Sequence, residues 1–62
     1  MKNLEGRQIL VFLKNGRKYS GKVIEVSKME NGICWIIIID KYKNRVTFCN
    51  TEISTMEEVD NV

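Results

Sequence analysis

The dipeptide Asn15-Gly16 constrains the fold of this sequence more than any other feature, because it separates two runs of strand-forming residues. Residues 8–14 are rich in large and β-branched apolar side chains, and residues 18–27 resume that pattern after the turn. Asparagine and glycine both adopt positive φ at low cost, as the two central positions of a tight hairpin require. The sequence therefore predicts an antiparallel β-hairpin near its beginning.

Three more strands are predicted in the remainder of the chain. Polar turn residues bound apolar stretches at residues 33–40, 45–50 and 53–57, although residues 53–59 can also be read as a short helix. Gly21 lies within the second strand, where a missing side chain permits a sharp bend or a close approach by another strand. No proline interrupts any strand. We therefore predict one all-β domain over residues 1–62, a small and strongly bent five-stranded antiparallel barrel.

The third predicted strand is apolar on both faces, unlike an antiparallel strand that has one face in water. One face is expected to join the core together with the fourth strand; it consists of Ile33, Trp35, Ile37, Ile39, Val46 and Phe48. The other face needs a cover. A chain of this length buries only about 60% of its unfolded surface, so we expect neighbouring subunits of an oligomer to supply that cover. The predicted interface consists of Cys34, Ile36, Ile38, Thr47, Cys49 and Ile53. Barrel curvature or the N-terminal segment is the alternative cover.

Residues 6–23 resemble the first motif of the Sm/Lsm family. In that motif an apolar strand ends in Leu-x-x-Gly-x-x-apolar-x-Gly, and the matching residues here are Leu13, Gly16, Tyr19 and Gly21. The remainder of the chain is similar only in the order and length of its strands. The resemblance implies an Sm-like fold, which is a five-stranded SH3-like barrel. It also implies that copies join into a ring through their fourth and fifth strands, and that the ring binds single-stranded, often uridine-rich, RNA.

The residues that read the base in Sm proteins are largely replaced in this sequence. Asn31 matches an asparagine that helps to hold a base in the pore of the ring, but Ser27 stands where the family has an aspartate. The second motif, apolar-Arg-Gly, corresponds to Phe48-Cys49-Asn50, which lacks both the arginine and the glycine. The resemblance therefore does not extend to the usual recognition of uridine, and RNA would have to be bound in another way.

Positive charge is unevenly spread along the chain. All ten Lys and Arg residues lie within residues 1–51 with four acids, and the other four acids follow from Glu52 onward. Cations on turns neutralise phosphates without reading sequence, and an aromatic ring among them can stack on a base. The candidate nucleic-acid-binding residues are Lys14, Arg17, Lys18, Asn31, Lys41, Tyr42, Lys43 and Arg45. The alternative is a set of solvated turns without a ligand.

Catalysis is not expected, because the chain has no histidine for acid–base work and no glycine-rich phosphate loop. We also expect no cofactor and no metal site. Cys34 and Cys49 are expected on adjacent strands and on the same face. They are read as two small buried hydrophobic residues, with a redox bridge or half of a metal site shared between subunits as the alternative.

A cytoplasmic location is expected, since residues 1–6 lack the apolar core of a secretory signal and the apolar run at residues 33–39 is too short to cross a bilayer. Two functional classes remain open. The first is an Sm-like protein that binds single-stranded RNA as a homo-oligomeric ring. The second is a barrel-type module for protein interaction or assembly, whose strand edges or apolar face engage a protein partner.

Overall fold

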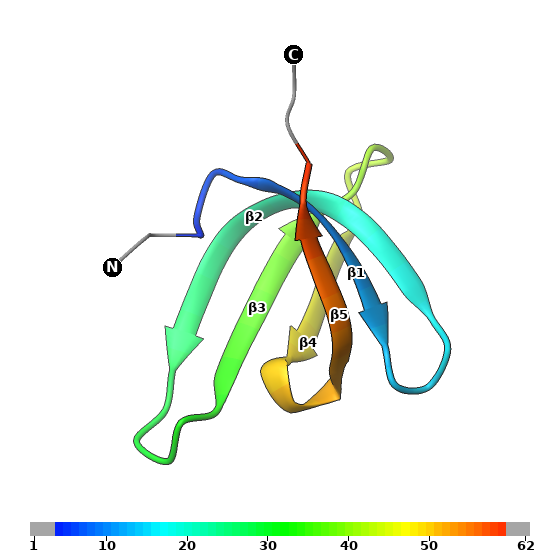
Figure 1. The fold of residues 1–62 in the computed structure, drawn as a ribbon. Coiled ribbons are helices and arrows are strands. Elements are labelled where there is room, and N and C mark those ends of the chain that lie inside the picture. The colour runs from blue at the N-terminus through cyan, green and yellow to red at the C-terminus, as the bar shows by residue number, and fades with distance from the viewer. Residues whose placement is uncertain (1–3, 60–62) are drawn as a thin grey trace.

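The computed structural model describes residues 4–59, so the first three and last three residues of the predicted domain lie outside the described part (Figure 1). The elements in chain order are β1 (Gln8–Leu13), β2 (Lys18–Lys28), β3 (Cys34–Ile39), β4 (Arg45–Cys49), the 3₁₀ turn η1 (Asn50–Glu52) and β5 (Ile53–Glu58). The prediction of an all-β fold with five strands is confirmed. The last segment, which had also been compatible with a short helix, is a strand.

The strands form one antiparallel sheet in the order β4-β3-β2-β1-β5. β2 is the longest strand, and it pairs first with β1 and then with β3. Figure 1 shows β2 as an arch that spans the sheet. The exchange of partners falls at Gly21 and Lys22, next to a register shift between Val23 and Glu25. Bulges of this kind increase the local bend and twist of a strand, which is how the sheet curls.

Gly21 has the role expected for it, since it permits a close approach between β2 and the end of β3. A Cβ atom at this position would lie 2.9 Å from the carbonyl carbon of Ile39 and 3.2 Å from the Cα of Asp40. Both contacts are with backbone, which cannot rotate away as a side chain can. The bend in β2 therefore depends on the absence of a side chain at residue 21.

The core lies on the concave side of the curled sheet. Its buried members are Ile9, Val11, Leu13, Val23, Ile36, Ile38 and Phe48. A turn over residues 4–7 adds to it: Leu4 packs against the core, and the Gly6 N–H donates to the Val23 carbonyl at 2.8 Å. Each fully buried side chain of this kind stabilises the fold by about 1.5–3 kcal/mol. Burial of these side chains is therefore the main source of stability.

The pairing of β3 with β4 reverses the predicted faces of β3. Ile36 lies opposite Phe48, and Ile38 lies opposite Val46. Ile36 and Ile38 are only 4% and 0% exposed, so they face the core, whereas Trp35 is 40% exposed on the other face. The prediction was therefore wrong for β3, since it assigned Trp35 to the core and Ile36 and Ile38 to the opposite face. A run that is apolar at every position has no alternation to show which face is buried, and a shift of one residue exchanges the two faces.

The predicted subunit interface required six residues to form one exposed apolar face, and the structure does not place them on such a face. Of its six residues, three are buried, two are half-buried and one is exposed; they are Ile36, Ile38 and Cys49, then Cys34 and Ile53, then Thr47. Ile53 packs against the core of its own chain. The side chains that β3 directs outward are instead Trp35, Ile37 and Ile39.

The sheet is curled but not closed. β4 and β5 are its two edges, and no ladder joins them within residues 4–59. The turn η1 connects them at one end, where the Glu52 carboxylate accepts a hydrogen bond from the Cys49 N–H at 3.0 Å. The Lys14 N–H donates to the Glu52 carbonyl at 2.8 Å, which ties η1 to the first hairpin. Each edge strand is thus left with one side that has no strand partner in the described part of the chain.

Candidate nucleic-acid interface

The turn between β1 and β2 presents three of the predicted nucleic-acid-binding cations: Lys14, Arg17 and Lys18, all exposed. The Asn15 Oδ1 accepts a hydrogen bond from the Arg17 N–H at 2.9 Å, and Gly16 adopts a φ of 91°. The hairpin that the Asn-Gly dipeptide predicted is present, but only Gly16 of the two turn residues has the positive φ expected of both. The Arg17 guanidinium donates to the Tyr19 hydroxyl at 3.3 Å, and this hydrogen bond raises the pKa of Arg17. The hairpin tip therefore carries permanent positive charge in an ordered backbone.

Phe12 belongs to the same surface and was not singled out from the sequence. It lies directly opposite Lys18 on β2 and Thr55 on β5, so the three side chains share the outer face of the sheet. Phe12 is 37% exposed. The signal that could have identified it is the alternation of β1, in which every second residue is buried. An exposed aromatic ring beside a lysine is the arrangement that binds a stacked base and its phosphate.

The turn between β3 and β4 holds three more predicted residues, Lys41, Tyr42 and Lys43, and β4 begins with a fourth, Arg45; all four are exposed. Asp40 orders this turn, because its Oδ1 accepts hydrogen bonds from the Tyr42 N–H at 2.9 Å and the Asn44 N–H at 2.8 Å. Lys43 has a φ of 69°, which a turn of this shape requires. The Lys41 ammonium lies 5.3 Å from the centre of the Tyr42 ring, within cation–π range. Tyr42 is 72% exposed.

Asn31 and the segment that corresponds to the second Sm motif are brought together by Asn50. The Asn50 side chain accepts a hydrogen bond from the Cys34 N–H at 3.0 Å and donates one to the Gly32 carbonyl at 3.2 Å. Asn31 itself accepts a bond from the Ile33 N–H at 3.3 Å, which shapes the same turn. Asn31 and Cys49 therefore lie around one surface hollow, and no arginine is among its lining residues.

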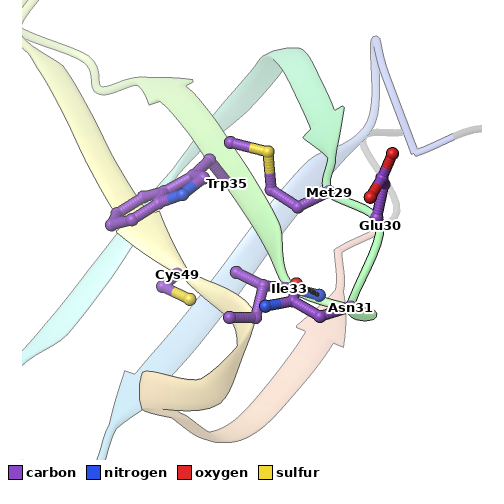
Figure 2. A pocket seen from close by; sticks show the side chains of 6 residues that line it. All are labelled: Met29, Glu30, Asn31, Ile33, Trp35 and Cys49. Atoms are coloured by element: carbon purple, nitrogen blue, oxygen red, sulfur yellow. Dashed lines mark hydrogen bonds between the residues drawn. The ribbon is translucent and has the colours of Figure 1, made fainter.

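This hollow, called the Trp35 pocket below, has a volume of about 610 Å³. Figure 2 shows the indole of Trp35 and the thioether of Met29 on one side, with Ile33 and Asn31 across from them and Cys49 below. The sixth lining residue, Glu30, stands on the turn at the rim. The pocket is therefore mainly apolar, with one carboxylate and one amide at its edge.

The structure does not gather the predicted nucleic-acid-binding residues into one site. They lie on the β1–β2, β2–β3 and β3–β4 turns, which stand at three separate corners of the sheet (Figure 1). The β1–β2 group combines three cations with an exposed aromatic side chain of the sheet, Phe12, whereas Asn31 adjoins the exposed Trp35 in a pocket whose lining contains no cation. The face that carries Phe12 is the strongest candidate interface.

Cys34 and Cys49 do not share a face, contrary to expectation. Cys49 lies opposite Trp35, whereas Cys34 precedes Trp35 and so points to the other side of β3. Both thiols are free, and the Cys49 thiol lies 3.2 Å from the Thr51 hydroxyl. Among residues 4–59 no group of three or more Cys, Asp or Glu side chains is placed to hold a metal ion. That part of the chain also contains no helix with the length and apolar character needed to span a bilayer.

A scan against models of protein families finds no match to this chain, and searches of curated proteins and of solved structures find none either. The class of protein is therefore defined by the fold alone: a small all-β protein with one curled, five-stranded antiparallel sheet.

Proposed function

We propose that this protein is a non-catalytic, Sm-like protein that binds single-stranded RNA as a homo-oligomeric ring. The observation that carries the proposal is the outer face of the first hairpin, where the exposed ring of Phe12 lies directly opposite Lys18. Lys14 and Arg17 continue the positive charge at the hairpin tip. A base stacks on Phe12 while the lysines contact the phosphates on either side.

The two edge strands support the ring. β4 begins with Arg45 after a turn that contains two lysines, whereas β5 ends with Glu57 and Glu58. An antiparallel pairing of β4 in one copy with β5 in the next places the basic start of one strand beside the acidic end of the other. A parallel pairing would separate them. Both edges also have unpaired backbone groups that such a pairing satisfies.

The test is the affinity of the full chain for a labelled single-stranded oligouridylate, followed by fluorescence anisotropy over a range of salt concentrations. Phe12→Ala is expected to weaken binding about 5- to 150-fold, the equivalent of one lost stacking contact. Phe12→Tyr keeps a stacking ring and is the matched control, with nearly unchanged affinity expected. Lys18→Gln is expected to reduce the slope of log affinity against log salt by about 0.7 for a single phosphate contact.

Lys28→Gln removes the same charge from the far end of β2 and is the control for Lys18→Gln. Two results would contradict the proposal. One is the absence of binding to any single-stranded RNA at low salt. The other is binding that neither Phe12→Ala nor Lys18→Gln alters.

The second candidate function is a module for protein interaction. The specific observation in its favour is the Trp35 pocket, in which Trp35 and Met29 are exposed beside an apolar hollow. Binding through such a pocket responds weakly to salt, whereas phosphate contacts weaken steeply, so the same salt series separates the two candidates.

A further inference from the structure

The RNA-binding function proposed above does not use the Trp35 pocket. The residues that line the pocket indicate which chemical groups it can bind. Its wall is made by Trp35, Met29 and Ile33, and its volume of about 610 Å³ lies within the range of ligand-binding pockets. Glu30 stands at the rim. A second acid, Glu25, lies opposite Ile37 on the same outer face. The pocket thus suits an aromatic or aliphatic group that has positive charge next to it.

The chain itself carries such a group in the Lys41–Arg45 turn. Tyr42 projects from it with 72% of its surface exposed. Lys41 and Lys43 flank it in the sequence, and the Lys41 ammonium lies 5.3 Å from the centre of the Tyr42 ring, so the ring is accompanied by positive charge. The charges of this turn therefore complement the acids beside the pocket.

The turn is ordered before any contact is made, which lowers the entropic cost of binding. Asp40 holds it through hydrogen bonds from the backbone N–H groups of Tyr42 and Asn44, at 2.9 and 2.8 Å. The Asp40 N–H also donates to the Asn44 carbonyl at 3.0 Å, and the Lys43 N–H donates to the Asp40 carbonyl at 3.0 Å. Tyr42 is consequently displayed on a rigid support and not on a flexible loop.

Tyr42 cannot reach the pocket of its own chain. The pocket lies at the start of β3, and the turn follows the end of β3, so the two stand at opposite ends of that strand (Figure 1). At about 3.3 Å per residue, the strand separates them by roughly 15–20 Å. We propose that the Lys41–Arg45 turn of one copy inserts Tyr42 into the Trp35 pocket of a second copy. Because the two surfaces differ, the contact is head-to-tail and leaves a turn and a pocket available for further copies.

One aromatic side chain in a pocket makes a small interface, and interfaces below about 1,200 Å² are typical of weak association. Self-association should therefore be measured by sedimentation equilibrium up to about 1 mM protein. Trp35 is the only tryptophan of the chain and lies in the pocket, so its emission reports occupancy directly. The wild-type protein is expected to gain mass with concentration while the Trp35 emission shifts to shorter wavelength.

Two variants remove one partner each and keep the fold and the reporter. Tyr42→Asp replaces the inserted aromatic ring with a carboxylate. Met29→Asp, at an exposed position, places a carboxylate in the apolar wall of the pocket. Each variant alone is expected to associate at least about 30-fold more weakly than the wild type, as for a residue that dominates an interface. A mixture of the two pairs an intact turn with an intact pocket, so it is expected to regain part of the concentration-dependent gain in mass and the shift in Trp35 emission.

The mixture distinguishes this contact from pairing of the edge strands. If both variants gain mass with concentration as the wild type does, this turn and pocket do not make the contact and the proposal is overturned. A wild-type protein whose mass does not rise with concentration up to about 1 mM overturns it as well, and so does a mixture that regains neither the gain in mass nor the shift in emission. As a further check of charge complementarity, Glu30→Lys combined with Lys43→Glu should restore association that either substitution alone weakens.

Discussion

At the scale of single residues, Gly21 is the position at which the fold tolerates substitution least. Gly21→Val would place side-chain atoms against the backbone of Ile39 and Asp40, where the Cβ alone is already too close. We expect the substitution to cost more than about 3 kcal/mol, a large part of the stability of a domain of this size. Urea unfolding followed by Trp35 fluorescence measures the change.

Ser20→Val is the matched control for Gly21→Val. Ser20 precedes Gly21 on β2 and is exposed on the outer face. A β-branched residue there is expected to change the free energy of unfolding by no more than about 0.5 kcal/mol. Equal stability of the two variants would show that β3 does not pass beside Gly21 as described.

At the scale of elements, the β2–β3 turn is attached to η1 by the side chain of Asn50. Asn50→Ala removes an acceptor for the Cys34 N–H and a donor to the Gly32 carbonyl. Since the Cys34 N–H is part-buried, we expect a loss of about 1–3 kcal/mol in the free energy of unfolding. The hydrogen exchange of the Cys34 amide is expected to accelerate correspondingly.

Asn44→Ala tests the specificity of that effect. The Asn44 side chain donates to Asp40 over a long 3.4 Å bond at an exposed site, so its loss should change stability by about 0.5 kcal/mol or less. If Asn50→Ala were as mild as Asn44→Ala, the contact between the β2–β3 turn and η1 would contribute nothing to the fold.

At the scale of the whole molecule, the open edges and their opposite charges predict assembly. Light scattering on a sizing column is expected to give a discrete mass that is a multiple of the 7.2 kDa chain. Arg45→Glu and Glu57→Lys should each reduce that mass by placing like charges side by side, and the double variant should recover it. A monomeric mass at low and at moderate salt would contradict the proposed ring. The face of the first hairpin that we propose for RNA binding would then have to act in a single copy.

The local features of the fold were predictable from the sequence because they depend on neighbouring residues. The Asn15-Gly16 turn was predicted from two residues, and the five strands were predicted to within one or two residues at their ends. The function of Gly21 followed from its place within a strand. The exposed cations of the first and third turns were also foreseen, since turn residues project from the sheet whatever the rest of the chain does.

Only the tertiary structure decided which faces are buried and which residues meet. The run at residues 33–39 is compatible with either register, and the choice depends on how β3 pairs with β2 and β4 on its two sides. That choice buries Ile36 and Ile38, exposes Trp35 and separates Cys34 from Cys49. The exposure of Phe12 likewise follows from the pairing of β1 with β2, which places Phe12 opposite Lys18 on the outer face of the sheet. Local chemistry thus determined the elements, and the register of pairing between strands determined which side chains reach the surface.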